Sequence, residues 1–168
     1  MKILVVYYSR TGVTKKAGGR IAAHLGEREG VQVAVEEIVE PKDRSGVLGW
    51  LGAGRDAMSK RETPIEPVQA NPADFDLVVI GTPVWAWTAA APVRTFCVQH
   101  GKQAKEVAFF CTMGGTGDKK TFEAMETLCG RAPVATLALV GRHVKKDDED
   151  AFAAKVKTFA EEISGECS

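Results

Sequence analysis

Residues 3–14, ILVVYYSRTGVT, join an apolar run to a turn that is rich in hydroxyl groups. The run from Ile3 to Tyr8 predicts a buried strand, and a helix is expected to begin at Thr14. Backbone N–H groups at a helix start, together with the positive end of the helix dipole, favour an anion such as phosphate. Ser9, Thr11 and Thr14 can add hydroxyl donors without adding charge. The stretch therefore predicts a strand, a turn and a helix arranged around a phosphate site.

This turn also has a simpler interpretation, because serine and threonine cap many helices that bind no ligand. It lacks the Gly-Lys-Ser/Thr ending of a Walker A loop and the G-x-G-x-x-G fingerprint of dinucleotide-binding proteins. ATP and NAD held by their usual loops are therefore disfavoured.

Length and composition favour one domain over residues 1–168, since a chain with 45% hydrophobic residues has enough apolar side chains for a substantial core. Lysine plus arginine and aspartate plus glutamate both total 22, so the formal net charge is zero. This balance gives no electrostatic case for nucleic acid or an anionic membrane surface. A small ligand in a neutral pocket is the favoured partner.

The cysteines form no C-x-x-C pair and show no metal-type spacing with the histidines. They are interpreted as the reduced thiols of a cytoplasmic protein. The apolar run at the N-terminus is too short for the hydrophobic region of a signal peptide, and no apolar stretch reaches membrane-spanning length.

Apolar runs alternate with helix-like segments along the chain. Because these runs are apolar on both faces, they are typical of central strands in a parallel sheet covered by helices on both sides. We expect an α/β fold with a doubly wound five-stranded parallel sheet, its strands at Ile3–Tyr8, Val31–Val39, Leu77–Ile80, Val107–Cys111 and Val134–Val140. The helices are expected at Thr14–Arg28, Ala89–His100, Thr116–Gly130 and Asp148–Ile163, with a weak helical segment in Ser45–Lys60.

Two segments have more than one interpretation. The acidic cluster Asp147–Asp150 at the start of the last predicted helix complements the helix dipole, and this structural role is preferred to a metal site. Ser45–Lys60 combines several glycines with apolar residues, among them Trp50. It is either a crossover that packs Trp50 on the sheet or a flap beside the ligand.

Two further loops of unusual composition follow predicted strands. Gly81–Thr88 contains Trp85 and Trp87, which either contact a flat ligand or pack in the core. Thr112–Gly117 contains three glycines that let backbone approach a ligand closely. A phosphorylated, flat, aromatic ligand would use these two loops together with the first turn.

The first turn, the Gly-Thr-Pro-Val-Trp loop leading into Ala-Pro-Val-Arg-Thr-Phe (Ala91–Phe96), and the loop Cys-Thr-Met-Gly-Gly-Thr-Gly (Cys111–Gly117) resemble the flavodoxin family of FMN-binding proteins. The resemblance covers essentially the whole chain and is to the short type. It implies the strand order 2-1-3-4-5, in which strands 1, 3 and 4 are neighbours. The three loops would then meet at the carboxyl edge of the sheet, around its switch point.

Carried over to this sequence, the resemblance implies FMN contacts from all three loops. These positions are Ser9, Arg10, Thr11, Gly12, Val13 and Thr14 for the phosphate, Thr82, Pro83, Val84 and Trp85 beside the isoalloxazine, and Thr112, Met113, Gly114 and Gly115 on its other side. The sequence departs from the family in the third loop, where carriers usually place an aromatic residue and this chain has Met113-Gly114-Gly115. One face of the flavin is therefore expected to be open.

The resemblance implies an FMN redox protein that passes electrons to or from a partner protein. The alternative is an FMN-dependent oxidoreductase that takes hydride from NAD(P)H and reduces a quinone or a similar acceptor; the open loop favours it, although no nicotinamide motif is recognisable. A third hypothesis is a binding module without flavin. No side chain is nominated as catalytic, because Cys111 near the supposed ring has the character of a small core residue.

Overall fold

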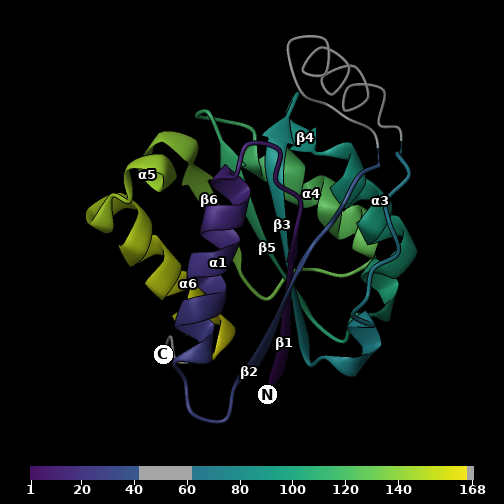
Figure 1. The fold of residues 1–168 in the computed structure, drawn as a ribbon, viewed down its shortest axis with the longest axis horizontal. Coiled ribbons are helices and arrows are strands. Elements are labelled where there is room, and N and C mark those ends of the chain that lie inside the picture. Colours follow the sequence, from purple (N-terminus) through teal and green to yellow (C-terminus); the bar gives the residue numbers. More distant parts are fainter. Residues whose placement is uncertain (42–61, 166–168) are drawn as a thin grey trace.

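The computed structural model describes residues 1–41 and 62–165, so the segment Ser45–Lys60 and Cys167 lie outside the described residues. Five parallel strands form a sheet of order β2-β1-β3-β5-β6, and their carboxyl ends are at the top of Figure 1. The strands are β1 (Lys2–Tyr7), β2 (Gln32–Glu37), β3 (Leu77–Trp85), β5 (Val107–Met113) and β6 (Thr136–Val140). The predicted doubly wound fold and the predicted order of these five strands are confirmed.

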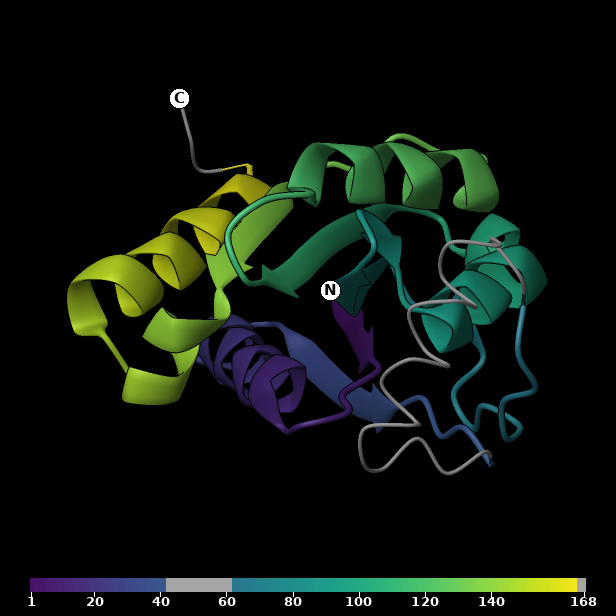
Figure 2. The same cartoon turned by 90° about the horizontal axis from the view of Figure 1, so that it is seen from above.

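Helices cover both faces of the sheet, as Figures 1 and 2 show. One face packs against α1 (Val13–Gly26) and α6 (Ala154–Ile163), and the other packs against α3 (Ala91–His100) and α4 (Asp118–Cys129). Alternate residues of β1 belong to the two cores: Val5 faces α1 and α6, whereas Leu4 faces α3. Burial on both faces explains why the strand is an unbroken apolar run. Short 3-10 helices lie at Pro72–Asp74 and Gly101–Gln103.

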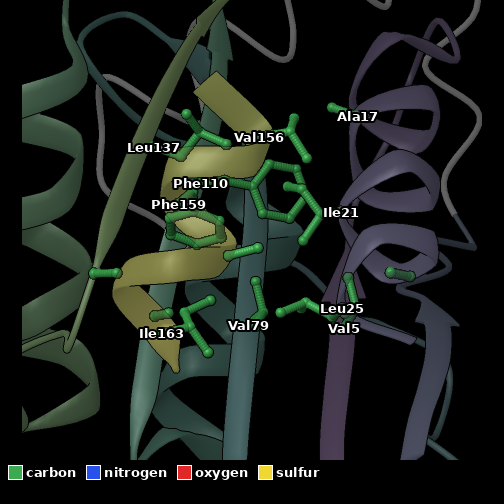
Figure 3. Close-up of a cluster of buried hydrophobic side chains, with 14 of the residues drawn as sticks. Val5, Ala17, Ile21, Leu25, Val79, Phe110, Leu137, Val156, Phe159 and Ile163 are labelled. Carbon is green, nitrogen blue, oxygen red and sulfur yellow. The ribbon is translucent and has the colours of Figure 1, made fainter. Parts of the chain in front are cut away.

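Phe110 of β5 sets how closely the helix α1 approaches the sheet. Its ring is fully buried and points toward Ile21 of α1, with Val156 of α6 beside it (Figure 3). A Cβ atom at Gly81 would lie 2.0 Å from Cζ of Phe110, so only glycine leaves room for the ring at that position. A Cβ atom at Gly18 of α1 would lie 3.3 Å from the same ring atom and 2.6 Å from Cδ1 of Tyr7. This packing fixes the start of α1, and with it the preceding turn, above the carboxyl end of β1.

The third strand is longer than predicted. Leu77–Ile80 was expected to end in a loop at Gly81, but β3 continues to Trp85 and then turns back as β4 (Thr88–Ala89), which pairs with it antiparallel. Residues Thr82–Trp85 are therefore strand rather than loop. The extension is possible because Val78–Pro83 keep a neighbour in β5, from Val107 to Thr112.

The chain after β6 also differs from the prediction. A short helix that was not predicted, α5 (Gly141–Lys146), comes first, and a π-helical turn at Glu149–Ala153 leads into α6. Asp148 joins these parts, because its Oδ1 accepts a hydrogen bond from the Ala151 N–H and its Oδ2 lies 2.9 Å from Nδ1 of His143. In the described parts of the chain, no helix is both long enough and apolar enough to cross a membrane.

Candidate functional site at the carboxyl edge of the sheet

The turn between β1 and α1 has the features expected of an anion site. Gly12 has φ +83° and precedes the first residue of α1, whose start carries no side-chain cap. The first N–H groups of the helix are therefore available to a ligand. Ser9 Oγ is buried and has no hydrogen-bond partner among the described residues. A buried hydroxyl without a partner lowers the stability of the protein, unless a bound ligand supplies the missing hydrogen bond. Thr11 and Gly12 are exposed beside it.

Thr14 lies in the first turn of α1 and links the first loop to the third. Its Oγ1 lies 2.8 Å from Oγ1 of Thr112 in β5, and both side chains are buried. The two hydroxyl groups thus bond to each other. This bond holds the start of α1 against β5, and the predicted contact of Thr14 with a phosphate stays a prediction.

Thr82 is fully buried, and its hydroxyl is used within the protein. Its Oγ1 accepts a hydrogen bond of 3.0 Å from the Ala90 N–H and donates one of 2.9 Å to the Pro83 carbonyl. These bonds tie β3 to the start of α3. Pro83 is the neighbour of Thr112 in the sheet. The residues predicted to contact the ring from the second loop (Thr82–Trp85) and from the third loop (Thr112–Gly115) are therefore adjacent.

Trp85 is half-buried at the end of β3 and contacts Tyr8 edge to face, with ring centroids 5.6 Å apart and planes at 88°. The Tyr8 hydroxyl donates to Oε2 of Glu40 at 3.4 Å, and Oε1 of Glu40 accepts a bond of 2.8 Å from Thr63 Oγ1. Thr63 in turn exchanges hydrogen bonds with Thr95 of α3.

This network links Trp85 to α3, and it was not predicted from the sequence. Tyr8 adjoins the predicted turn and Thr95 belongs to the Ala91–Phe96 motif, so the sequence could have indicated that both lie near the site. No sequence pattern indicates Glu40 or Thr63, because only the fold brings these two residues together.

The turn between β3 and β4 holds two residues, Ala86 and Trp87, at φ +47° and +59°. Such left-handed conformations cost an L-residue about 1–2 kcal/mol each, and hairpin turns of this kind normally use glycine or asparagine. The hairpin is held against the start of α4. A Cβ atom at Gly117, which has φ +112°, would lie 2.8 Å from Cγ1 of Val84 and 3.3 Å from Cδ1 of Trp87.

The loop after β5 is open. Gly114 and Gly115 are exposed, and a Cβ atom at either would meet nothing within 4 Å. Met113 is half-buried at the end of β5. A Cβ atom at Gly141 would lie 3.6 Å from both the Met113 carbonyl oxygen and Cγ1 of Val13, so the start of α5 closes the edge near the first loop.

Cys111 is fully buried in β5, and burial, helped by the charge of Asp118, raises the pKa of its thiol to about 12. A neutral, buried thiol is a core group rather than a nucleophile. Arg10 is half-buried beside Ser9. The fold thus brings the three predicted loops to one edge, while their contact with a cofactor stays a prediction.

Comparisons with known proteins agree with this arrangement. The model of a family described as flavodoxin matches residues 2–156. The chain is similar to a putative flavoprotein from Bacteroides uniformis ATCC 8492, at 25% identity, 86% of this chain, 96% of that chain and a TM-score of 0.70. It is also similar to a flavoprotein from Lactobacillus acidophilus NCFM in complex with FMN, at 24% identity and a TM-score of 0.68. The match covers 86% of this chain and 97% of that chain. The apo form of an NADH:FMN oxidoreductase shares the fold, at 16% identity and a TM-score of 0.67. The match covers 97% of this chain and 89% of that chain.

Proposed function

Because the chain belongs to the flavodoxin family, whose cofactor is FMN, we propose that it binds FMN at the carboxyl edge of its sheet and passes electrons to or from a partner protein. When bound, FMN supplies the redox chemistry through its isoalloxazine ring. The residues of this chain bind the cofactor, orient it and decide which molecules reach it.

The observation that carries the proposal is the buried hydroxyl of Ser9, which has no partner among the described residues. It lies beside a helix start without a side-chain cap. A phosphate oxygen would accept a hydrogen bond from this hydroxyl and from the first N–H groups of α1. The residues present therefore fit the phosphate of FMN, with Ser9, Arg10, Thr11, Gly12 and Val13 around it.

Trp85 and Gly114 with Gly115 are the proposed neighbours of the isoalloxazine. Trp85 has an aromatic face of the kind that stacks on a flat ring, and its indole is held by Tyr8. Thr14, Thr82 and Thr112, predicted to contact FMN, have a further role in this proposal. Their hydroxyl groups bond within the protein, so they hold the three loops in register and act as positioning residues.

A second candidate function is an FMN-dependent oxidoreductase that oxidises NAD(P)H and reduces a quinone or similar acceptor. The specific observation in its favour is the open loop at Gly114 and Gly115, which leaves access to that side of the site. The shared fold with an NADH:FMN oxidoreductase is compatible with this candidate.

Purification and two transfer assays test these proposals. We expect the protein to carry the visible absorbance of oxidised flavin, or the apo form to regain it with FMN. A carrier, once reduced with dithionite, passes electrons to a protein acceptor such as ferric cytochrome c and shows no steady oxidation of NAD(P)H. Steady NAD(P)H oxidation that requires added quinone supports the second candidate instead. A colourless protein that FMN does not refill would refute both.

A further inference from the structure

The strand β6 lies at one end of the sheet, and among the strands that the structure describes it pairs with β5 alone. The Phe109 N–H of β5 donates to the Ala135 carbonyl. Backbone groups of alternate residues in a strand point to the same side, so Ala135 and Leu137 bond to β5. The N–H and C=O groups of Thr136 and Ala138 therefore point outward, away from the sheet.

This outer edge of β6 lacks the features with which proteins usually protect an edge strand. Its sequence, TLALV, contains no charged residue, proline or glycine. Thr136 is exposed, and Ala138 and Val140 are half-buried. An open strand edge without charge or proline readily pairs with another strand. The edge is therefore suited to accept a further strand through backbone hydrogen bonds.

A hollow of about 240 Å³ borders this edge, between the start of β6 and the helix α6. Both Thr136 and Leu137 line it, although neighbouring residues of a strand point to opposite faces, so the hollow opens at the edge of the strand. From α6 it is lined by exposed side chains that include Lys155, Thr158 and Glu162. Because these positions are three and four residues apart, they lie on one side of the helix.

The middle of α6 lies beside the middle of β6. Leu137 belongs to the same buried cluster as Val156 and Phe159 of α6, and Figure 3 shows these three side chains together. In Figure 1, α6 runs from the carboxyl edge back toward the amino edge, opposite to β6. Lys155 therefore lies toward the carboxyl edge and Glu162 toward the amino edge, on either side of the middle of β6.

We propose that the outer edge of β6 is the interface of a homodimer. Two copies of β6 would pair antiparallel about a two-fold axis at Ala138, which would extend the sheet across both subunits. Ala138 would face its own copy, and Thr136 would face the partner subunit's Val140. The outward backbone groups of these residues would then form the hydrogen-bonded pairs of an antiparallel ladder.

The charges on α6 favour a second copy of this chain as the occupant of the edge. The two-fold axis reverses the direction of α6, so Lys155 comes opposite the partner subunit's Glu162, and the reciprocal contact forms by symmetry. Thr158 lies near the axis, where it brings no charge. The surface is thus complementary to itself in charge and in backbone bonding. The formal net charge of zero adds no repulsion between the copies.

This arrangement leaves both proposed FMN sites open. Antiparallel pairing of β6 directs the carboxyl edges of the two subunits toward opposite ends of the dimer. No residue of the first, second or third loop takes part in the pairing. The proposal therefore does not depend on the proposed function.

Sedimentation equilibrium of the full chain tests the proposal, and we expect the wild type to form dimers. Lys155→Glu and Glu162→Lys each place like charges at both symmetric contacts. Each should raise the dimer dissociation constant by about tenfold. The double variant Lys155→Glu/Glu162→Lys restores opposite charges and should return the constant to that of the wild type. The control is Glu29→Lys, an equal charge change at an exposed residue next to β2, at the other end of the sheet, and it should leave the constant unchanged.

Hydrogen exchange of the wild type gives a second readout, because the outward N–H of Ala138 is bonded only in the dimer. Its exchange should become slower as the protein concentration rises. The proposal is overturned if the wild type remains a monomer up to its limit of solubility. It is also overturned if the double variant dimerises no better than the single variants, or if exchange at Ala138 does not depend on concentration. In both of these cases any dimer would use another surface.

Discussion

The hydroxyl oxygens of Thr14 and Thr112 lie 2.8 Å apart although the two residues are 98 positions apart in the sequence. Thr14 is in the first turn of α1 and Thr112 is near the end of β5, and both are buried. The bond fixes the helix start that would receive the phosphate relative to the strand that leads to the open loop. We infer that the two parts of the FMN site are positioned by this contact.

Thr112→Val should lower the free energy of unfolding of the apo protein by about 1–3 kcal/mol, because the Thr14 hydroxyl is left buried without its partner. The double variant Thr14→Val/Thr112→Val should lose less than the sum of the single variants, since both polar groups are then gone. Urea unfolding of the four proteins measures this coupling. Additive losses would show that the two hydroxyls do not depend on each other.

Ser9→Ala should separate cofactor binding from stability. The buried Ser9 hydroxyl has no partner among the described residues, so its removal should leave the stability of the apo protein within about 0.5 kcal/mol of the wild type. Its loss should weaken FMN binding by about 1.5–3 kcal/mol, the range for a hydrogen bond to a charged group. Fluorescence titration of FMN into the apo protein gives the affinity.

The control for that comparison is Ser164→Ala. The Ser164 hydroxyl donates to the Ala160 carbonyl at the end of α6, away from the carboxyl edge of the sheet. This variant should bind FMN as tightly as the wild type. If Ser9→Ala does the same, the phosphate is bound elsewhere.

Gly117→Ala should destabilise the protein strongly. Alanine at φ +112° is strained, by about 1–3 kcal/mol, and its Cβ would meet Val84 at 2.8 Å. Gly115→Ala is the matched control, because a Cβ there meets nothing within 4 Å. Chemical unfolding of the apo forms should place Gly115→Ala close to the wild type, and equal stability of the two variants would contradict the packing of the hairpin on α4.

Stability should fall in alkaline solution. Burial raises the pKa of Cys111 from its ordinary value of 9.0 to about 12, so the folded state keeps a neutral thiol while the unfolded state ionises first. This contribution is fully present below pH 9.0 and is lost as the pH rises toward 12. The slope for one such group is at most about 1.4 kcal/mol per pH unit.

Cys111→Ala tests this assignment. The free energy of unfolding of the variant should decline less steeply above pH 9.0 than that of the wild type. Part of the slope should remain, because burial also raises the pKa of Tyr7 and the pKa of Cys97 is raised by contact with Cys129 and by burial. Parallel curves for the two proteins would show that Cys111 ionises equally in both states.

The sequence allowed the sheet to be predicted because its signals were local. The run Ile3–Tyr8 is apolar on both faces, and the hydroxyl-rich turn after it contains a glycine. These patterns reflect burial between two helical layers and the geometry of a helix start, which depend on neighbouring residues. The convergence of three loops then followed from the strand order.

The elements and contacts that were not predicted either depend on residues far apart in the sequence or lack the residues that normally mark a turn. Ala86-Trp87 carries no glycine or asparagine, so the hairpin between β3 and β4 gave no signal, and Thr82–Trp85 was read as a loop. The helix α5 is short and buries Val144 alone among its six residues, which is too little for a helical pattern. The bond between Thr14 and Thr112 joins side chains that no local pattern relates.

The most direct test of the central claim compares FMN with riboflavin, which has the same ring but no phosphate. Titration of both into the apo protein measures what the turn Ser9–Val13 contributes. If this turn binds the phosphate, FMN should bind at least about a hundredfold more tightly than riboflavin, because several charge-assisted hydrogen bonds are made only by FMN. Equal affinities for the two flavins would contradict the claim.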